Sequence, residues 1–113
     1  REVLIAYNLF LADATMETAR EIVLNIRQPG LRALSFLVDG QAQISMNLTN
    51  VDIMNVDTAY DIVAQYANIA RAELVGLMPM QALTKIEPSR WNELDIGVDK
   101  TIEARFDELL KAQ

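Results

Sequence analysis

The chain has 113 residues, of which 51% are hydrophobic, and its formal net charge at pH 7 is −6. This length fits one small domain with its own core, and the acidic balance argues against nucleic-acid binding, which needs a basic surface. The sequence has no apolar run near the about 20 residues of a membrane helix, no signal-peptide pattern and no cysteine, so we expect a cytoplasmic protein.

The first predicted element is a strand from Val3 to Leu11, which is rich in branched and aromatic residues. Both of its faces are largely apolar, so this strand should lie in the centre of a sheet, with Asn8 as the polar exception. Apolar residues at helical spacing then predict a helix over residues 14–27. Asp13 or Thr15 can cap this helix by accepting a bond from its first free N–H groups.

A β-hairpin follows, because Asp39-Gly40 is the strongest short turn signal between two strands. Its strands are predicted from Leu31 to Val38 and from Gln41 to Leu48. The second strand alternates strictly, with an apolar face and a face of uncharged polar side chains. That polar face suits a neutral heteroaromatic or amide ligand, or a docking surface, and a merely solvated strand remains the alternative. Its members are Gln41, Gln43, Ser45 and Asn47.

A second helix is predicted over residues 56–67 with Asn55 as its cap, and a short fourth strand over residues 68–72. The order strand–helix–strand–strand–helix–strand predicts an α+β, ferredoxin-like βαββαβ fold with both helices on one face of an antiparallel sheet. We expect residues 1–73 to form this core. Residues 74–113 should form a helical extension packed on the same domain, and its last helix should start at Asp99.

The predicted topology gathers polar residues on one side of the sheet. The first and third strands should lie side by side, which places Asn8 with Gln43, Ser45 and Asn47 on the face without helices. Glu73 should lie near the rim of this group. An isolated carboxylate next to an apolar segment needs a partner or a function.

Histidine is absent as well as cysteine. The commonest general base of enzymes and the commonest ligands of metal ions are therefore missing. If the chain belongs to an enzyme, either carboxylates transfer the protons or the catalytic base lies elsewhere. We assign no catalytic residue and no metal site to this chain.

Three segments stand out in order along the chain: Ile5-Ala6-Tyr7-Asn8, the run GQAQISMNL at 40–48, and ELVGLMP at 73–79. Together they resemble the C-terminal subdomain of the transferase domain of glutamate formiminotransferases, in the formiminotransferase-cyclodeaminase family. The resemblance covers about residues 3–85 and departs at Met54 and Asp57, where family members commonly carry a Thr-x-x-His pattern.

This resemblance implies a folate-dependent enzyme of histidine degradation, which moves a formimino or formyl group between N-formimino-glutamate and tetrahydrofolate. The folate groove would lie between two subdomains, and the N-terminal subdomain, in cis or in trans, would hold the catalytic histidine. This chain would form one wall of the groove and be inactive alone. The folate- and substrate-binding residues would be Asn8, Gln43, Ser45, Asn47 and Glu73.

Two other interpretations remain open. The chain could be a stand-alone ferredoxin-like module that binds a ligand or dimerises without catalysis, or a protein-interaction module with no small ligand. Since a ferredoxin-like sheet leaves one face uncovered, we expect the isolated chain to form a homodimer through that face.

Overall fold

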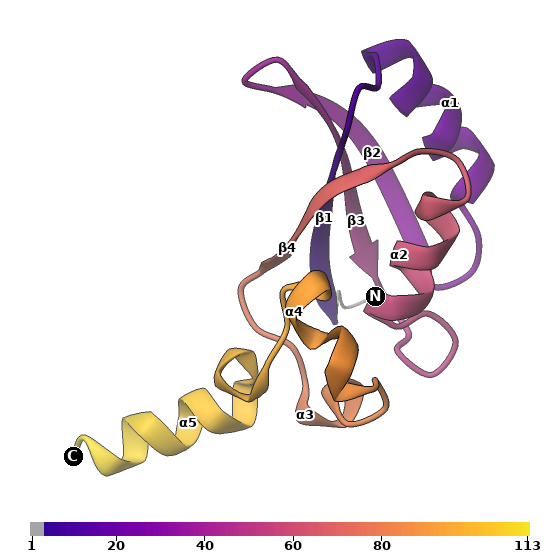
Figure 1. Ribbon diagram of the computed structural model, residues 1–113. Helices are drawn as coiled ribbons and strands as arrows, with labels where there is room; N and C mark the ends of the chain where they lie inside the picture. Colours follow the sequence, from indigo (N-terminus) through magenta and orange to yellow (C-terminus); the bar gives the residue numbers. More distant parts are fainter. Residues whose placement is uncertain (1–3) are drawn as a thin grey trace.

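The sheet is the centre of the molecule. The computed structural model describes residues 4–113, and its strands are hydrogen-bonded in the order β2-β3-β1-β4, every pair antiparallel (Figure 1). This confirms the predicted ferredoxin-like order; Val3, where the first strand was predicted to start, lies outside the described residues. The strands are β1 (Ile5–Leu11), β2 (Leu31–Val38), β3 (Gln41–Leu48) and β4 (Ile69–Val75).

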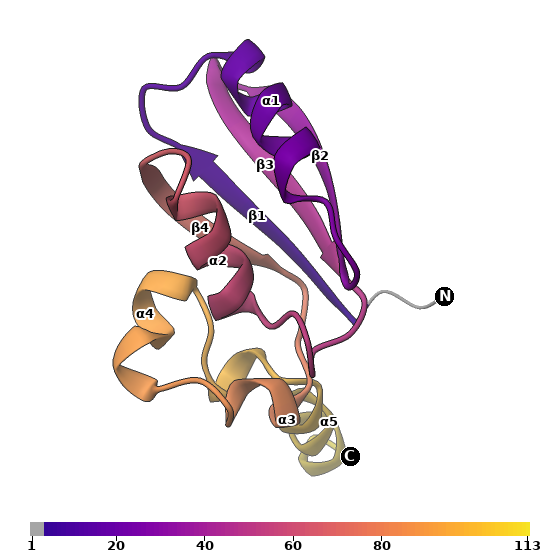
Figure 2. The same ribbon diagram turned by 90° about the vertical axis from the view of Figure 1, so that its right-hand side faces the viewer.

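Two helices, α1 (Met16–Ile26) and α2 (Val56–Ala64), lie on the same side of the sheet (Figure 2). Of the two caps considered for α1, Thr15 is the one used, since its hydroxyl accepts from the N–H of Thr18 at 3.1 Å. Asn55 caps α2 as predicted, and its Nδ2 also donates to the carbonyl of Ala82.

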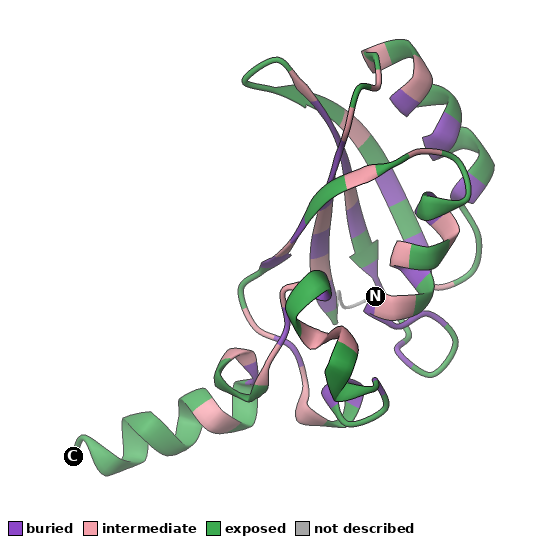
Figure 3. Ribbon diagram, viewed as in Figure 1, coloured by how far each residue is buried: buried purple, intermediate pink, exposed green. Residues whose placement is uncertain are grey.

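The turn at Asp39-Gly40 has positive φ at both residues, 51° and 79°, as the hairpin signal predicts. It pairs Val38 with Gln41 and thereby sets the register of the whole β2–β3 hairpin. The apolar residues of β3 consequently face the helices, where Ala42, Ile44, Met46 and Leu48 are at most 1% exposed (Figure 3).

After β4 the chain forms short helices, and several of their residues belong to the same core. Met78, Leu83 and Leu94 are each 0% exposed, and the hydroxyl of Tyr7 on β1 donates to the carbonyl of Leu94 at 2.8 Å. These elements are α3 (Met80–Leu83), η1 (Pro88–Arg90), α4 (Trp91–Leu94), η2 (Val98–Lys100) and α5 (Ile102–Lys111).

The last helix, α5, extends away from the rest of the chain and buries none of its residues (Figure 1). It starts at Ile102 with Thr101 as its cap, so the predicted start at Asp99 was wrong. Asp99 instead lies in the 3-10 turn η2, whereas the Thr101 hydroxyl accepts from the N–H of Ala104. Within residues 4–113, no helix combines the length and the apolar character needed to cross a membrane.

Candidate functional site

The side of the sheet that α1 and α2 leave uncovered, here called the open face, is organised in rows across the strands. In an antiparallel sheet, residues directly opposite one another send their side chains to the same face. The strand register therefore defines which open-face residues are neighbours. Three rows matter here, and each contains one residue from every strand.

The middle row crosses the sheet through Asn8. On β1, Asn8 lies opposite Ser45 of β3 on one side and opposite Glu73 of β4 on the other. Its Nδ2 donates to Oε1 of Glu73 at 3.1 Å. Leu34 of β2, opposite Ser45, completes the row. Glu73, for which the sequence indicated no partner, is thus hydrogen-bonded to Asn8, another of the predicted site residues.

The next row is aromatic and more buried. Gln43 lies between Phe10 on β1 and Phe36 on β2, and it is only 7% exposed. The guanidinium of Arg71, opposite Phe10 on β4, stacks on the Phe10 ring with its carbon 3.8 Å from the ring centroid. Such a stack holds the cation at the surface while covering the ring. Gln43 therefore lies among the aromatic side chains and is less accessible than Ser45.

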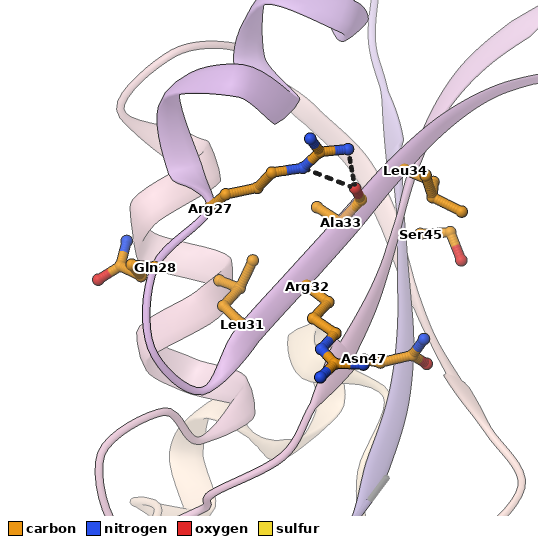
Figure 4. Close-up of a pocket in the computed structure, with 8 residues that line it drawn as sticks. All are labelled: Arg27, Gln28, Leu31, Arg32, Ala33, Leu34, Ser45 and Asn47. Atoms are coloured by element: carbon orange, nitrogen blue, oxygen red, sulfur yellow. Dashed lines mark hydrogen bonds between the residues drawn. The ribbon is translucent and has the colours of Figure 1, made fainter. Parts of the chain in front are cut away.

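The third row contains the most exposed of the predicted residues. Asn47 lies opposite Ala6 on β1 and opposite Arg32 on β2, and Val75 of β4 pairs with Ala6. Figure 4 shows the side chains of Arg32 and Asn47 next to each other at the edge of the sheet. A hollow of about 450 Å³ runs along this edge and is lined by Arg27, Arg32, Leu34, Ser45 and Asn47, among others.

The structure brings the five predicted site residues onto one face. Asn8, Ser45 and Glu73 are adjacent in the middle row, and Gln43 and Asn47 lie in the rows on either side. In the described residues, the side chains of Gln43, Ser45 and Asn47 form no hydrogen bond with another residue. Amides and hydroxyls can both donate and accept, so these groups can bind the polar edge of a heterocycle or an amide.

Two charged residues of this face, Arg32 and Arg71, were missed from the sequence. Counting back from the Asp39-Gly40 turn places Arg32 opposite Asn47, so the hairpin signal could have found it. Arg71 lies two residues before Glu73 on β4, so strand alternation places both on the same face. The predicted end of this strand at Ala72 left Glu73 outside the strand, and this relation was missed. Together, Arg32 and Arg71 add two cations to an otherwise neutral polar surface, and guanidinium groups bind carboxylates well.

The family departures lie away from this face. Met54 is 3% exposed and packs in the core. Asp57 lies in the first turn of α2, where its Oδ1 accepts from the N–H of Thr58. No group of three or more His, Cys, Asp or Glu side chains within residues 4–113 is arranged to hold a metal ion.

Comparison with known proteins identifies the family of this chain. A family model described as the formiminotransferase domain matches residues 6–90. The glutamate formimidoyltransferase of Thermoplasma acidophilum is 36% identical in a match that covers 76% of this chain but 32% of the relative. The chain thus spans about a third of that relative's length. This chain belongs to the formiminotransferase domain family.

Proposed function

We propose that this chain is the C-terminal subdomain of a folate-dependent glutamate formiminotransferase-like protein, with the open face as one wall of the folate groove. The observation that carries the proposal is the placement of Asn8, Ser45, Asn47 and Glu73 on the sheet face that α1 and α2 leave uncovered. Family membership supplies the reaction class, the transfer of a formimino group.

The side chains of the open face fit the two chemical parts of such a ligand. The amides of Asn8 and Asn47 and the hydroxyl of Ser45 can pair with the ring nitrogens and amino group of a pterin. Arg32 and Arg71 can bind the carboxylates of a glutamate moiety. Glu73 keeps Asn8 oriented through their hydrogen bond, so the Asn8 carbonyl oxygen is directed for a ligand donor.

The partner in this proposal is the N-terminal subdomain, in cis or in trans. This chain contains no histidine and covers 32% of the curated relative, which supports a general acid–base group supplied by the N-terminal subdomain. The substrates would be N-formimino-glutamate and tetrahydrofolate, in histidine degradation. The second subdomain would cover Leu34 and Phe36, which are 57% and 45% exposed in this chain.

The experiment is a titration of the isotope-labelled chain with 5-formyltetrahydrofolate, followed by amide NMR spectra. We expect shifts for Asn8, Ser45 and Asn47 and none for Leu24 or Asn25 on the outer side of α1. Glutamate and a pterin lacking its glutamate serve as separate ligands, to distinguish the two halves of the site. Shifts confined to the helix side, or none at millimolar ligand, would contradict the proposal.

A second candidate is a ferredoxin-like module that binds a ligand or dimerises without catalysis. This second candidate is favoured by Asp57, at a position where family members commonly have histidine. Here Oδ1 of Asp57 accepts a hydrogen bond from the N–H of Thr58 in the first turn of α2. The two candidates differ when the chain is mixed with a histidine-bearing N-terminal subdomain. Formimino transfer that requires both parts supports the transferase, and its absence with folate binding intact supports the module.

A further inference from the structure

Two opposite charges lie on the open face of β4 without neutralising each other. Arg71 and Glu73 are two residues apart, so strand alternation puts both side chains on this face, about 7 Å apart along the strand. Among residues 4–113, neither side chain takes part in a salt bridge. Side chains of this length could reach each other at that spacing, so their separation needs a cause.

Uncharged side chains of β1 hold each of the two charges in place. The Arg71 guanidinium lies on the Phe10 ring, with its carbon 3.8 Å from the ring centroid, and a stacked guanidinium keeps the N–H groups at its edge free. Asn8 donates through Nδ2 to Oε1 of Glu73 at 3.1 Å. An ionised carboxylate has about four acceptor positions on its two oxygens, and Asn8 occupies one of them. Both charged groups are therefore oriented and remain open to a ligand.

The carboxylate of Asp95, at the outer edge of β4, is by contrast already satisfied. Its Oδ2 accepts from the N–H of Leu74 at 2.9 Å, and its Oδ1 pairs with the ammonium group of Lys100. Among the strand residues of the open face that the structure describes, Glu73 is the one carboxylate. A cationic group of a ligand on this face would therefore bind at Glu73.

We propose that Glu73 selects the formimino group of the donor substrate, while Arg71 binds the carboxylate at the other end of the same molecule. This inference rests on the proposed function, which makes N-formimino-glutamate a substrate of the open face. A formimino group on nitrogen is an amidine, and amidines are strong bases that are protonated at neutral pH. The resulting cation can donate two N–H groups to one carboxylate, as a guanidinium does. The cation and the side-chain carboxylate of N-formimino-glutamate lie at opposite ends, so one molecule can contact Glu73 and Arg71 together.

The same contact discriminates against the formyl analogue of the donor. N-formyl-glutamate has the same two carboxylates, but a neutral carbonyl oxygen replaces the charged nitrogen. Because an ionised carboxylate only accepts hydrogen bonds, this oxygen would face Glu73 with no donor between them. A site rejects a ligand that leaves polar groups unpaired in this way. Glu73 therefore favours the transfer of a formimino group over that of a formyl group.

The other arginine of the open face, Arg32, is too distant to share this ligand. In the strand order β2-β3-β1-β4, the strands of Arg32 and Arg71 are three spacings apart, or about 14 Å. A molecule the size of N-formimino-glutamate can bridge Arg71 and Glu73 on β4, but it cannot reach from there to Arg32. The donor thus lies at the β4 end of the open face, and Arg32 at the β2 end is left for the glutamate moiety of the folate.

Calorimetric titration of the complete protein with N-formimino-glutamate and with N-formyl-glutamate tests the role of Glu73. We expect Glu73→Gln to weaken binding of the formimino ligand at least about tenfold, because hydrogen bonds between charged groups are lost. N-formyl-glutamate should bind this variant as well or better, since the new amide supplies a donor. Glu73→Asp should retain the preference for the formimino ligand, with weaker binding. Glu87→Gln, at an exposed position outside the sheet, removes the same charge and should change neither affinity. A formimino preference that survives Glu73→Gln would overturn the proposal.

Arg71→Gln gives the second measurement. Both ligands carry the carboxylate assigned to Arg71, so this variant should weaken both by the same factor and leave their ratio unchanged; a change for one ligand alone would contradict this assignment. Circular dichroism confirms that the variants are folded. Titration of the unmodified protein with 5-formyltetrahydrofolate separates this inference from the proposed function. Folate binding without a preference that depends on Glu73 contradicts only the donor site, whereas absence of folate binding contradicts the proposed function.

Discussion

Asn8 and Glu73, which lie 65 positions apart in the sequence, face each other across the β1–β4 pair with an N···O distance of 3.1 Å. We expect Asn8→Asp to lower the free energy of unfolding by about 0.5–1 kcal/mol at pH 7, because two carboxylates would then lie directly opposite one another. Urea unfolding at pH 7 measures this loss. Adding Glu73→Gln to the variant should restore most of it, since an amide again faces a carboxylate; a double variant no better than Asn8→Asp would contradict the pairing.

The exposed amide of Asn47 and the partly buried hydroxyl of Ser45 on the open face are expected to bind ligand. In the complete protein, Asn47→Ala or Ser45→Ala should weaken folate binding by about 1–3 kcal/mol, because each leaves a polar group of the ligand unpaired. Their effect on the free energy of unfolding should stay within about 0.5 kcal/mol. Calorimetric titration with folate and urea unfolding measure the two quantities. Asn92→Ala and Ser89→Ala, at exposed positions outside the sheet, are matched controls that should change neither.

The chain alone is expected to show no formimino transfer. It has no histidine, and general acid–base catalysis alone contributes about 10²–10⁴-fold to a rate. Loss of the second wall would remove substrate positioning in addition. Spectrophotometric assay of the purified chain with N-formimino-glutamate and tetrahydrofolate should give the uncatalysed rate. Turnover by this chain would contradict the assignment of the catalytic base to another subdomain.

Tyr7 should make the fold sensitive to alkali. Burial raises the pKa of Tyr7 well above its ordinary value of about 10, and Tyr60 and Asp95 nearby raise it further. Above pH 10 the unfolded chain therefore loses this proton while the folded chain keeps it, so stability falls as pH rises, by about 1.4 kcal/mol per pH unit. Below pH 10 this contribution is fully present.

Urea unfolding between pH 8 and pH 11.5 checks the alkaline loss. Tyr7→Phe should flatten the fall above about pH 10, at the cost of the hydrogen bond to the Leu94 carbonyl, about 1 kcal/mol at neutral pH. Tyr66→Phe, at a ring that is 48% exposed, is the control and should keep the wild-type profile. A Tyr7→Phe profile as steep as that of the wild type would contradict this account.

Local signals in the sequence were sufficient for the hairpin and for most of the open face. The Asp39-Gly40 turn sets the β2–β3 register, and strict alternation then places Ser45 and Asn47 without further information. The burial of Gln43 could not be foreseen, because it depends on Phe10 and Phe36 from two other strands. Contacts between distant segments leave no trace in local periodicity.

At the C-terminal end of the chain, too, local sequence patterns did not predict the structure fully. Asp99 and Thr101 are both acceptable helix caps by residue type, and the choice depends on where η2 ends. Here the Thr101 N–H bonds to the Val98 carbonyl and Met78 holds the adjacent backbone of Lys100 and Ile102. Likewise, the apolar stripe of α5 predicts a packed helix, yet Phe106 is 60% exposed in this structure.

The hydrogen bond from Tyr7 to Leu94 joins residues 87 positions apart, and it has a consequence for how the chain folds. The central strand β1 precedes its partners β3 and β4 in the sequence, and the hydroxyl of its Tyr7 bonds to Leu94 of α4, which comes later still. Such long-range contacts slow folding, because loop closure must precede the contacts that reward it. During synthesis, the pairing of β1 with β4 and the Tyr7 hydrogen bond must therefore wait until the residues up to α4 have left the ribosome, and we expect chaperone binding to concentrate on β1 until then.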